Sequence, residues 1–212
     1  MYTPALFKQP DTQQQLAFIR EHSFGILINS VDQVPQATHL PFELLEKEDG
    51  SYCLQTHLAR ANPQWRSLHP EREVLTIFQG PHAYISPRWY DHVNVPTMNY
   101  VAVHVYGLVR LVEDAEEVYQ LLKRQIDWHE TGAAHSFHIE QLSETFLRAE
   151  MRSLVGLEVT ITRVEATSKL SQNRDEANHK NIISELSKSD KPEEQALLAN
   201  MRQVYERRGY KH

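Results

Sequence analysis

The sequence predicts an α+β fold that is mainly β, with an antiparallel sheet and helices that flank it. The expected order of elements is one helix, about six strands, two helices, one strand and two helices. Strands that follow one another through short turns are typical of antiparallel sheets, which can close into a barrel. A chain of 212 residues, of which 41% are hydrophobic, is long enough to bury a good-sized core.

Hydrophobic alternation and turn residues predict the strands. Both faces of segment 99–112 are largely apolar, so we expect a central strand covered on both sides, with a bend permitted at Gly107. Pro41 places the second strand at a sheet edge or a bulge. The dipeptide Asp49-Gly50 is a strong hairpin signal. The expected strands cover residues 24–31, 36–45, 51–57, 73–79, 82–86, 99–112 and 156–166.

Capping residues predict where the helices begin and end. Asp11 and Gln14 have the spacing of a capping box. Asn62 followed by Pro63 predicts the first residues of a short helix. Gly209 is a good C-terminal stop. The other expected helices cover residues 11–22, 114–129, 140–154, 175–186 and 192–208.

Charge and cysteine content limit the function classes. The net charge of −6 argues against a surface that binds nucleic acid by charge alone, because such binding needs Lys and Arg to neutralise phosphates. The single cysteine, Cys53, excludes an internal disulfide framework and fits a reducing cytoplasm. No apolar run approaches the roughly 20 residues of a membrane-spanning helix, and the first residues lack a signal-peptide pattern. We therefore expect a cytoplasmic protein that does not enter a membrane.

Residues 57–65 have a physical rationale for binding an anion. A strand ends, Arg60 follows, and a helix begins at Asn62. A helix N-terminus presents free N–H groups, and an arginine adds a forked, permanently charged contact. The alternative is an ordinary capped helix beside a solvated arginine.

Residues 80–90 place three aromatic side chains, a hydroxyl group and an arginine around two prolines. A stiff aromatic shelf suits a flat ligand with a polar edge, although the same residues could be core or a turn. Lys169, Gln172 and Arg174 directly follow the last strand and could supply donors to an anion or to the rim of a ring. The alternative for these three is a solvated loop.

Several familiar site patterns are missing from the sequence. The seven glycines follow neither the dinucleotide-binding nor the P-loop spacing. There is no nucleophile elbow and no catalytic-cysteine setting. His135 and His138 are three residues apart, but they follow Gly132 and match no zinc-binding pattern, so we expect no metal site.

Taken together, the chain resembles the PaiB-like family, described as FMN-binding negative transcriptional regulators. The resemblance covers nearly the whole chain. Its motifs are residues 1–4 (MYTP), 57–65 (HLARANPQW), 80–87 (GPHAYISP), 89–90 (WY), 95–97 (VPT), 99–104 (NYVAVH) and 169–174 (KLSQNR). One departure is Met98, where the family pattern has a tryptophan.

The resemblance implies an antiparallel split β-barrel of the FMN-binding type with C-terminal helices. It further implies a homodimer with FMN at the subunit interface. Residues 1–170 would form the barrel domain, and residues 171–212 a helical extension packed on the barrel or on the partner subunit. The resemblance implies that the FMN phosphate is bound by His57, Arg60, Ala61 and Asn62. The flavin ring or ribityl chain would be flanked by Tyr84, Ile85, Ser86, Trp89 and Tyr90, with Thr38 and His39 at the ring edge. The flavin of the partner subunit would be reached by Lys169, Gln172 and Arg174.

Three functions are compatible with these features. The family description implies a flavin-binding negative regulator of transcription, for which a DNA contact would fall on the basic C-terminal residues Arg202, Arg207, Arg208 and Lys211. The same residues could equally be a solvated helix face. An FMN-dependent oxidoreductase acting on a small molecule is the alternative, with the flavin supplying the chemistry. A third hypothesis is a relative that keeps the barrel but holds no flavin and binds other proteins.

Overall fold

The computed structural model describes residues 1–209, which form two compact units. The terminal unit contains residues 1–15, 79–103 and those from Glu165 onward. The central unit contains residues 16–78 and 104–164. The sequence-based division at residue 170 does not coincide with these units and stays a prediction.

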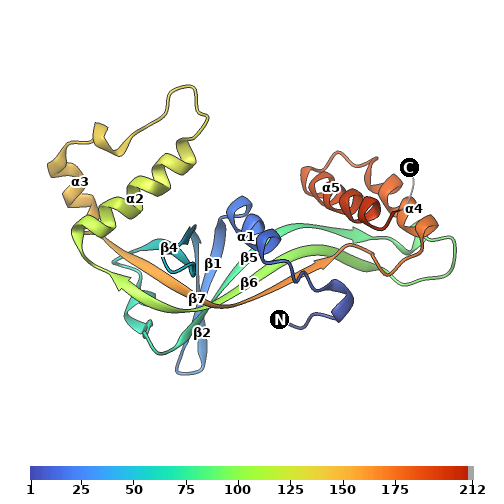
Figure 1. Cartoon of the computed structure of the whole chain (residues 1–212), viewed down its shortest axis with the longest axis horizontal. Coiled ribbons are helices and arrows are strands. Elements are labelled where there is room, and N and C mark those ends of the chain that lie inside the picture. The colour runs from blue at the N-terminus through green and yellow to red at the C-terminus, as the bar shows by residue number, and fades with distance from the viewer. Residues whose placement is uncertain (210–212) are drawn as a thin grey trace. The chain divides into compact units, whose positions relative to one another are not determined.

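Seven strands form one sheet in the order β2-β1-β5-β6-β7-β4-β3 (Figure 1). Strand β1 pairs antiparallel with β2 and β5, and β4 pairs antiparallel with β3 and β7. The strands are β1 (Phe24–Val31), β2 (Val34–Pro41), β3 (Glu43–Glu46), β4 (Tyr52–Ala59), β5 (Glu73–Ile85), β6 (Thr97–Val112) and β7 (Leu154–Lys169). Strands β5, β6 and β7 contribute residues to both units. The expected α+β class, mainly β with an antiparallel sheet, is confirmed.

Helices of the α type and short 3-10 helices complete the fold. The α-helices are α1 (Thr12–Glu21), α2 (Ala115–Glu130), α3 (Glu144–Met151), α4 (Glu176–Leu186) and α5 (Pro192–Arg207). The 3-10 helices are η1 (Ala5–Phe7), η2 (Pro63–Ser67), η3 (Pro87–Trp89) and η4 (Ile139–Gln141). Half of the predicted capping box is present, because Asp11 accepts a hydrogen bond from the backbone N–H of Gln14 at 3.0 Å. The other half is absent, since the Gln14 side chain donates to the Asp11 carboxylate and the Asp11 N–H donates to Gln9.

In the central unit the sheet curls until β2, at one edge, contacts β4 near the other edge. The Thr56 hydroxyl donates to the carbonyl oxygen of Pro41 at 2.6 Å, and Gln125 Nε2 of α2 donates to the same oxygen at 3.2 Å. Inside lie side chains that are at most 1% exposed: Leu27, Leu54, Leu58, Phe78, Val105, Leu121, Leu157 and Val159. These contacts give the barrel a continuous apolar core, which is the main favourable term in its stability.

Gly107 and Gly156 let strands approach more closely than other residues would allow. A Cβ atom on Gly107 would lie 2.4 Å from the carbonyl oxygen of Thr160. One on Gly156 would lie 2.9 Å from the Cβ atom of Val112. Strand β6 continues without interruption through Gly107, so this glycine provides space for β7 and does not mark the end of a strand.

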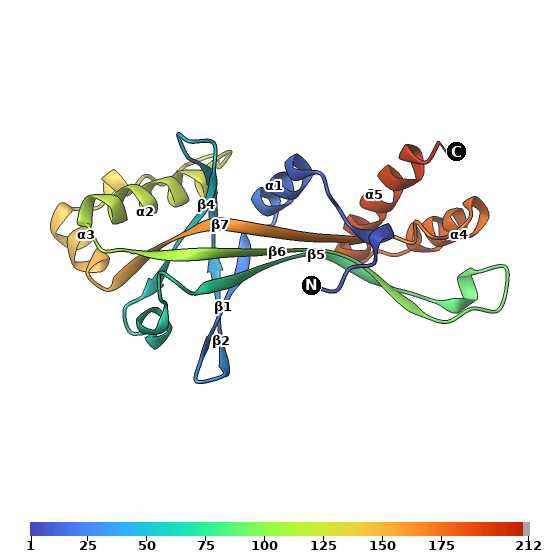
Figure 2. The ribbon, with the colours of Figure 1, turned by 60° about the horizontal axis from the view of Figure 1, so that its bottom comes forward.

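The terminal unit contains the N-terminal residues, the α4–α5 pair and parts of three strands. Helices α4 and α5 lie side by side in both views (Figures 1 and 2). Their shared core consists of side chains that are at most 2% exposed: Ile182, Leu186, Leu197, Leu198, Met201 and Tyr205. Lys8 forms an isolated antiparallel bridge with Thr167. The two predicted helices are therefore present, and each buries one apolar face against the other.

Five expected elements differ from the structure. The strand predicted over residues 36–45 is two strands, β2 and β3, because the chain turns at Phe42, whose buried ring packs 5.5 Å from that of Phe78. The strands predicted over 73–79 and 82–86 are one strand, β5. The helix predicted over 140–154 is η4 followed by α3, since Ser143 caps a new helix through the N–H of Phe146. The helix predicted at residue 63 is the 3-10 helix η2.

Candidate functional site

The fourteen residues expected to contact FMN fall into two groups, one in each unit. The central unit holds Thr38, His39, His57, Arg60, Ala61 and Asn62. The terminal unit holds Tyr84, Ile85, Ser86, Trp89, Tyr90, Lys169, Gln172 and Arg174. Within each unit, the fold brings residues that are far apart in the sequence into contact.

Thr38 and Asn62 belong to a hydrogen-bond network around a buried glutamine. Asn62 Nδ2 donates to the Thr38 hydroxyl at 3.0 Å, and the Asn62 side chain caps η2 by accepting from the N–H of Gln64. The Thr38 hydroxyl donates to Gln64 Oε1 at 2.5 Å. Gln64 Nε2 donates to the side-chain oxygen of Asn29 at 2.9 Å and to the carbonyl of Leu27 at 3.2 Å. The predicted cap is confirmed, and the network fixes η2 against β1 and β2.

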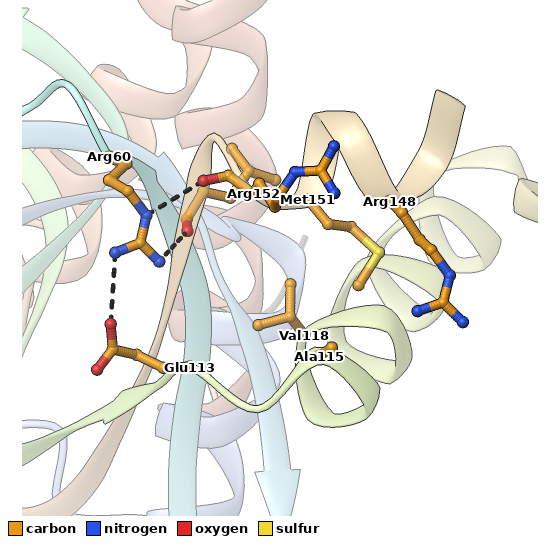
Figure 3. Close-up of a pocket in the computed structure, with 8 residues that line it drawn as sticks. Arg60, Glu113, Ala115, Val118, Arg148, Met151 and Arg152 are labelled. Atoms are coloured by element: carbon orange, nitrogen blue, oxygen red, sulfur yellow. Dashed lines mark hydrogen bonds and ion pairs between the residues drawn. The ribbon is translucent and has the colours of Figure 1, made fainter. Parts of the chain in front are cut away.

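Arg60 directly follows β4 and is held by the chain at the start of β7 (Figure 3). Its Nε donates to the carbonyl oxygen of Arg152 at 3.2 Å, and its Nη2 donates to that of Leu154 at 3.1 Å. Nη1 faces the carboxylate of Glu113 at 3.4 Å. Its Cζ also lies 5.5 Å from the ring centroid of Trp65. The guanidinium group is therefore oriented by the protein, although the Arg60 side chain is 41% exposed.

A cavity of about 460 Å³ opens beside Arg60 (Figure 3). Its apolar walls are Ala115, Val118, Met151 and Leu154, and its charged lining is Arg60, Glu113, Arg148 and Arg152. Three arginines and one glutamate make this lining net positive. A pocket with apolar walls and a few oriented charges is typical of a site for a small anionic group.

The two histidines of the central group have different surroundings. His57 Nδ1 lies 3.0 Å from Gln125 Oε1, and burial lowers the pKa of His57 below its ordinary value. The ring is therefore neutral near pH 7, and the amide oxygen of Gln125 identifies Nδ1 as the protonated nitrogen. His39 is exposed on β2, where its ring stacks on that of Phe24 with 6.1 Å between centroids. Ala61 is exposed in the turn between β4 and η2.

In the terminal unit, a proline-flanked turn displays the aromatic residues. Ser86 caps η3 by accepting from the N–H of Arg88, and Ile85 is fully buried beneath it. Tyr84 is 53% exposed, whereas Tyr90 is 8% exposed. The guanidinium carbon of Arg174 lies 4.8 Å from the centroid of the Tyr90 ring. Two of the sequence-predicted motifs, about 80 residues apart, thus meet in a cation–π contact.

The Tyr90 hydroxyl has no hydrogen-bond partner among residues 1–209, although it is buried. A buried hydroxyl without a partner costs about 1–3 kcal/mol. Such atoms usually accompany a bound water or ligand, so this hydroxyl marks a place where a polar group is missing.

The segment Lys169 to Arg174 is a tight turn held from several sides. Ser171 has a left-handed backbone with φ of 59°, and its hydroxyl pairs with the side chain of Asn99 at 2.9 Å. Gln172 closes the turn by accepting from the N–H of Leu170 at 2.7 Å and donating to the carbonyl of Ser168 at 2.6 Å. The side-chain amide of Gln172 therefore stabilises this turn through its own hydrogen bonds.

Lys169 and Arg174, the two basic residues of this segment, both contact other parts of the terminal unit. Lys169 Nζ donates to the Thr97 hydroxyl at 2.5 Å. The carbonyl oxygen of Arg174 accepts from Arg208 Nη1 at 2.8 Å, while its guanidinium lies over Tyr90. The turn at residues 169–174 therefore carries two cations, one of which lies over the Tyr90 ring.

Sequence reasoning missed several residues that build these sites. Gln64 lies inside the 57–65 motif but is not among the predicted FMN contacts. Its position two residues after the cap Asn62 is the one local signal that could have indicated its role. It is 2% exposed, and a buried amide of this kind needs a network of partners. Glu113 and Arg152 are 53 and 92 residues from Arg60, the residue they contact. No local pattern connects residues at such separations.

Comparison with known proteins identifies the family. Residues 1–163 match the family model described as "Putative FMN-binding domain". The chain belongs to this family. It is also 38% identical over 192 residues to the "Protease synthase and sporulation protein PAI 2" of Bacillus subtilis, covering 91% of this chain and 92% of that protein. The expected PaiB-like resemblance is therefore confirmed, and FMN is the cofactor that this family assigns to the chain.

Solved structures confirm the split-barrel fold. The FAD and heme binding protein of Mycobacterium smegmatis superposes with a TM-score of 0.59 at 14% identity, over 76% of this chain and 73% of that one. The flavocytochrome Anf3 of Azotobacter vinelandii gives a TM-score of 0.57 at 14% identity, over 76% and 69% of the two chains. At this identity the likeness concerns the fold alone.

The residues present fit a flavin mononucleotide. Its ring needs aromatic or apolar walls, for which Tyr84 is exposed and Trp89 half-buried. Its polar groups need donors, and the candidates are the unpaired Tyr90 hydroxyl and the cations of Lys169 and Arg174. Bound flavin would bring redox chemistry, while the chain would orient it and exclude water. Among residues 1–209, no helix is long and apolar enough to cross a membrane. Within the same residues, no three His, Cys, Asp or Glu side chains are grouped as metal ligands.

Proposed function

We propose that this chain is an FMN-binding protein that acts in negative control of transcription. The observation that carries the flavin assignment is the buried Tyr90 hydroxyl without a partner, lying in a predicted cofactor motif under the guanidinium of Arg174. A flavin ring beside Tyr90 would satisfy that hydroxyl and would stack on aromatic surface. The family membership supports the identity of the cofactor.

The central unit, taken by itself, offers a position for the phosphate group of a ligand such as FMN. Arg60 is the fixed guanidinium of the central unit, and it lines a cavity with net positive charge. His57 and Asn62 are its neighbours in the motif. We further propose a homodimer with flavin at the subunit interface, in the reducing cytoplasm indicated by the lone Cys53. Static light scattering with and without FMN tests the dimer, and a monomeric mass in both conditions would contradict it.

The flavin assignment is tested by the visible absorption spectrum of the purified protein. The protein is incubated with FMN, the excess is removed by gel filtration, and the spectrum is recorded. We expect a flavin spectrum that stays with the protein at about one equivalent per chain. Protein that passes through the column colourless would move the assignment to a protein-binding function.

A relative of this chain is named for protease synthesis and sporulation, which supports a regulatory role. Of the basic C-terminal residues, Arg202 is exposed on α5, whereas Arg207 donates to Gln14 Oε1 at 3.2 Å and Arg208 to Arg174. Lys211 lies outside the described residues. Arg202 is therefore the residue of this helix with the clearest access to a nucleic-acid partner.

The regulatory role is tested by a gel-shift selection from genomic DNA fragments at modest salt, with the parent and Arg202→Gln proteins. A shifted fragment that the variant binds more weakly supports a DNA contact on α5. If no fragment shifts and NADH or NADPH reduces the bound flavin, the oxidoreductase function is the better description.

A further inference from the structure

Arg60 has one side of its guanidinium free to exchange partners. Nε and Nη2 donate to the backbone carbonyls of Arg152 and Leu154, so these two donors hold the plane of the group in place. Nη1 faces the carboxylate of Glu113, and at 3.4 Å this contact is long for a charged pair. The protein thus fixes the orientation of the Arg60 guanidinium, while Nη1 makes only a long ion pair with Glu113.

Glu113 is free to leave that position. Its side chain is 57% exposed and that of Arg60 is 41% exposed. Ion pairs in such exposed positions contribute about 0–1 kcal/mol, so losing this one should not unfold the protein. Glu113 also precedes Asp114, the residue that caps α2, and takes no part in that cap. Among residues 1–209, its carboxylate makes no hydrogen bond other than the one to Arg60.

The surroundings favour a stronger anion at the same place. Arg148 and Arg152 line the cavity with Arg60, and Figure 3 shows Glu113 as the one acidic side chain labelled there. Val118 and Met151 add apolar surface to the wall beside these charges. A phosphate dianion carries more charge than a carboxylate and accepts hydrogen bonds from a guanidinium in the same geometry.

We propose that Glu113 is an exchangeable counter-ion, which occupies the anion position at Arg60 and leaves it when the phosphate group of a ligand enters. Glu113 thereby sets how strongly the chain prefers a phosphorylated flavin to an unphosphorylated one. This inference rests on the proposed FMN function, because it assigns the flavin phosphate to the Arg60 cavity. Glu113 competes with the phosphate group for Arg60 and so weakens the binding of FMN.

The test compares FMN with riboflavin, which lacks the phosphate. Dissociation constants for both are measured by calorimetry on the full chain and on Glu113→Gln. We expect Glu113→Gln to bind FMN about two- to fivefold more tightly and riboflavin unchanged, because an exposed ion pair of this kind is worth at most about 1 kcal/mol. Arg60→Gln should bind FMN more weakly and leave riboflavin unchanged.

Glu116→Gln is the matched control. Glu116 is an exposed glutamate of the first turn of α2, it contacts Gln120, and it does not line the Arg60 cavity. The change in net charge is the same, so an effect of overall charge would appear in both variants. In the Arg60→Gln background, Glu113→Gln should have no further effect, since the partner that holds the phosphate is gone.

The outcomes separate the inference from the function. If Arg60→Gln reduces FMN affinity but Glu113→Gln leaves the FMN-to-riboflavin ratio unchanged, the counter-ion inference is wrong and the FMN function stands. If the parent protein binds neither flavin, the FMN function fails. In that case inorganic phosphate is the probe, measured by calorimetry, and equal phosphate affinity in parent and Glu113→Gln overturns the inference as well.

Discussion

His179 Nε2 lies 3.0 Å from the carbonyl oxygen of Leu170, so this ring nitrogen carries the proton and donates it to the turn at residues 169–174. The imidazole is fully buried and stacks on Tyr205, with 5.7 Å between centroids and 12° between planes. Its other nitrogen, Nδ1, has no hydrogen-bond partner among residues 1–209. The α4–α5 pair thereby holds the turn that carries Lys169 and Arg174.

Stability should fall in mild acid because of this histidine. Burial, followed by the nearby charge of Arg208, lowers the pKa of His179 below its ordinary value of 6.5. The unfolded chain therefore takes up a proton at a higher pH than the folded chain. Its contribution to stability is fully present above pH 6.5 and is lost as the pH falls toward the lowered pKa, by at most about 1.4 kcal/mol per pH unit.

Urea unfolding between pH 7.5 and 5.0 measures this dependence. In His179→Gln the loss of stability on acidification should be smaller than in the parent protein. Burial also lowers the pKa of His22 and His57, so some dependence should remain. Equal slopes in parent and variant would show that His179 is not responsible.

Replacing Gln64 should weaken the central unit. Gln64→Leu keeps a similar volume but leaves the Thr38 hydroxyl, the Asn29 amide and the Leu27 carbonyl without this partner. We expect a loss of about 1–3 kcal/mol in the free energy of unfolding, the usual cost of unsatisfied buried polar groups. Chemical unfolding measures it, with the exposed Gln141→Leu as a control expected within about 0.5 kcal/mol of the parent.

Gly107→Ala should be more damaging than an alanine at an open glycine. The new Cβ would meet the backbone oxygen of Thr160 at 2.4 Å, and backbone cannot rotate away as a side chain can. Gly132 has φ of 84° and nothing within 4 Å of its added Cβ, so Gly132→Ala should cost only the conformational strain of about 1–2 kcal/mol. Thermal unfolding of the two variants should rank Gly107→Ala as the less stable, and the reverse order would contradict the close approach of β6 and β7.

Tyr90→Phe should separate stability from cofactor binding. Removing a buried hydroxyl without a partner should leave the flavin-free protein as stable as the parent or more stable by about 1 kcal/mol. The same change should weaken FMN binding if the flavin satisfies that hydroxyl. Thermal unfolding without FMN and fluorescence titration with FMN give the two readouts, and unchanged FMN affinity would remove the hydroxyl from the flavin contacts.

Arg174→Gln tests the neighbouring cation. It removes the guanidinium from the Tyr90 ring, while the backbone carbonyl that accepts from Arg208 remains. We expect weaker binding of both FMN and riboflavin, since the contact concerns the ring region and not the phosphate. Arg66→Gln, which removes a guanidinium from Trp65 in the central unit, serves as the matched cation–π control and should leave riboflavin affinity unchanged.

Features that act over a few residues were determined by the sequence itself. Asn62 caps η2, as its position predicts, and Asp114 caps α2 at the predicted start of that helix, because a cap needs only the next three residues. Gly50 has φ of 80° in the predicted hairpin turn, since only glycine adopts that conformation freely. The motifs around Tyr90 and Arg174 are likewise contiguous in the chain, so the sequence is enough to indicate the family.

Features that join distant residues were decided only by the tertiary structure. Arg60 and Glu113 are 53 residues apart, and Asn99 and Ser171 are 72 apart. Whether the Arg60 guanidinium is oriented depends on the carbonyls of Arg152 and Leu154, which the start of β7 brings to it. The physical reason is that side-chain hydrogen bonds form over about 3 Å of space, and only the pairing of strands puts such residues within that reach.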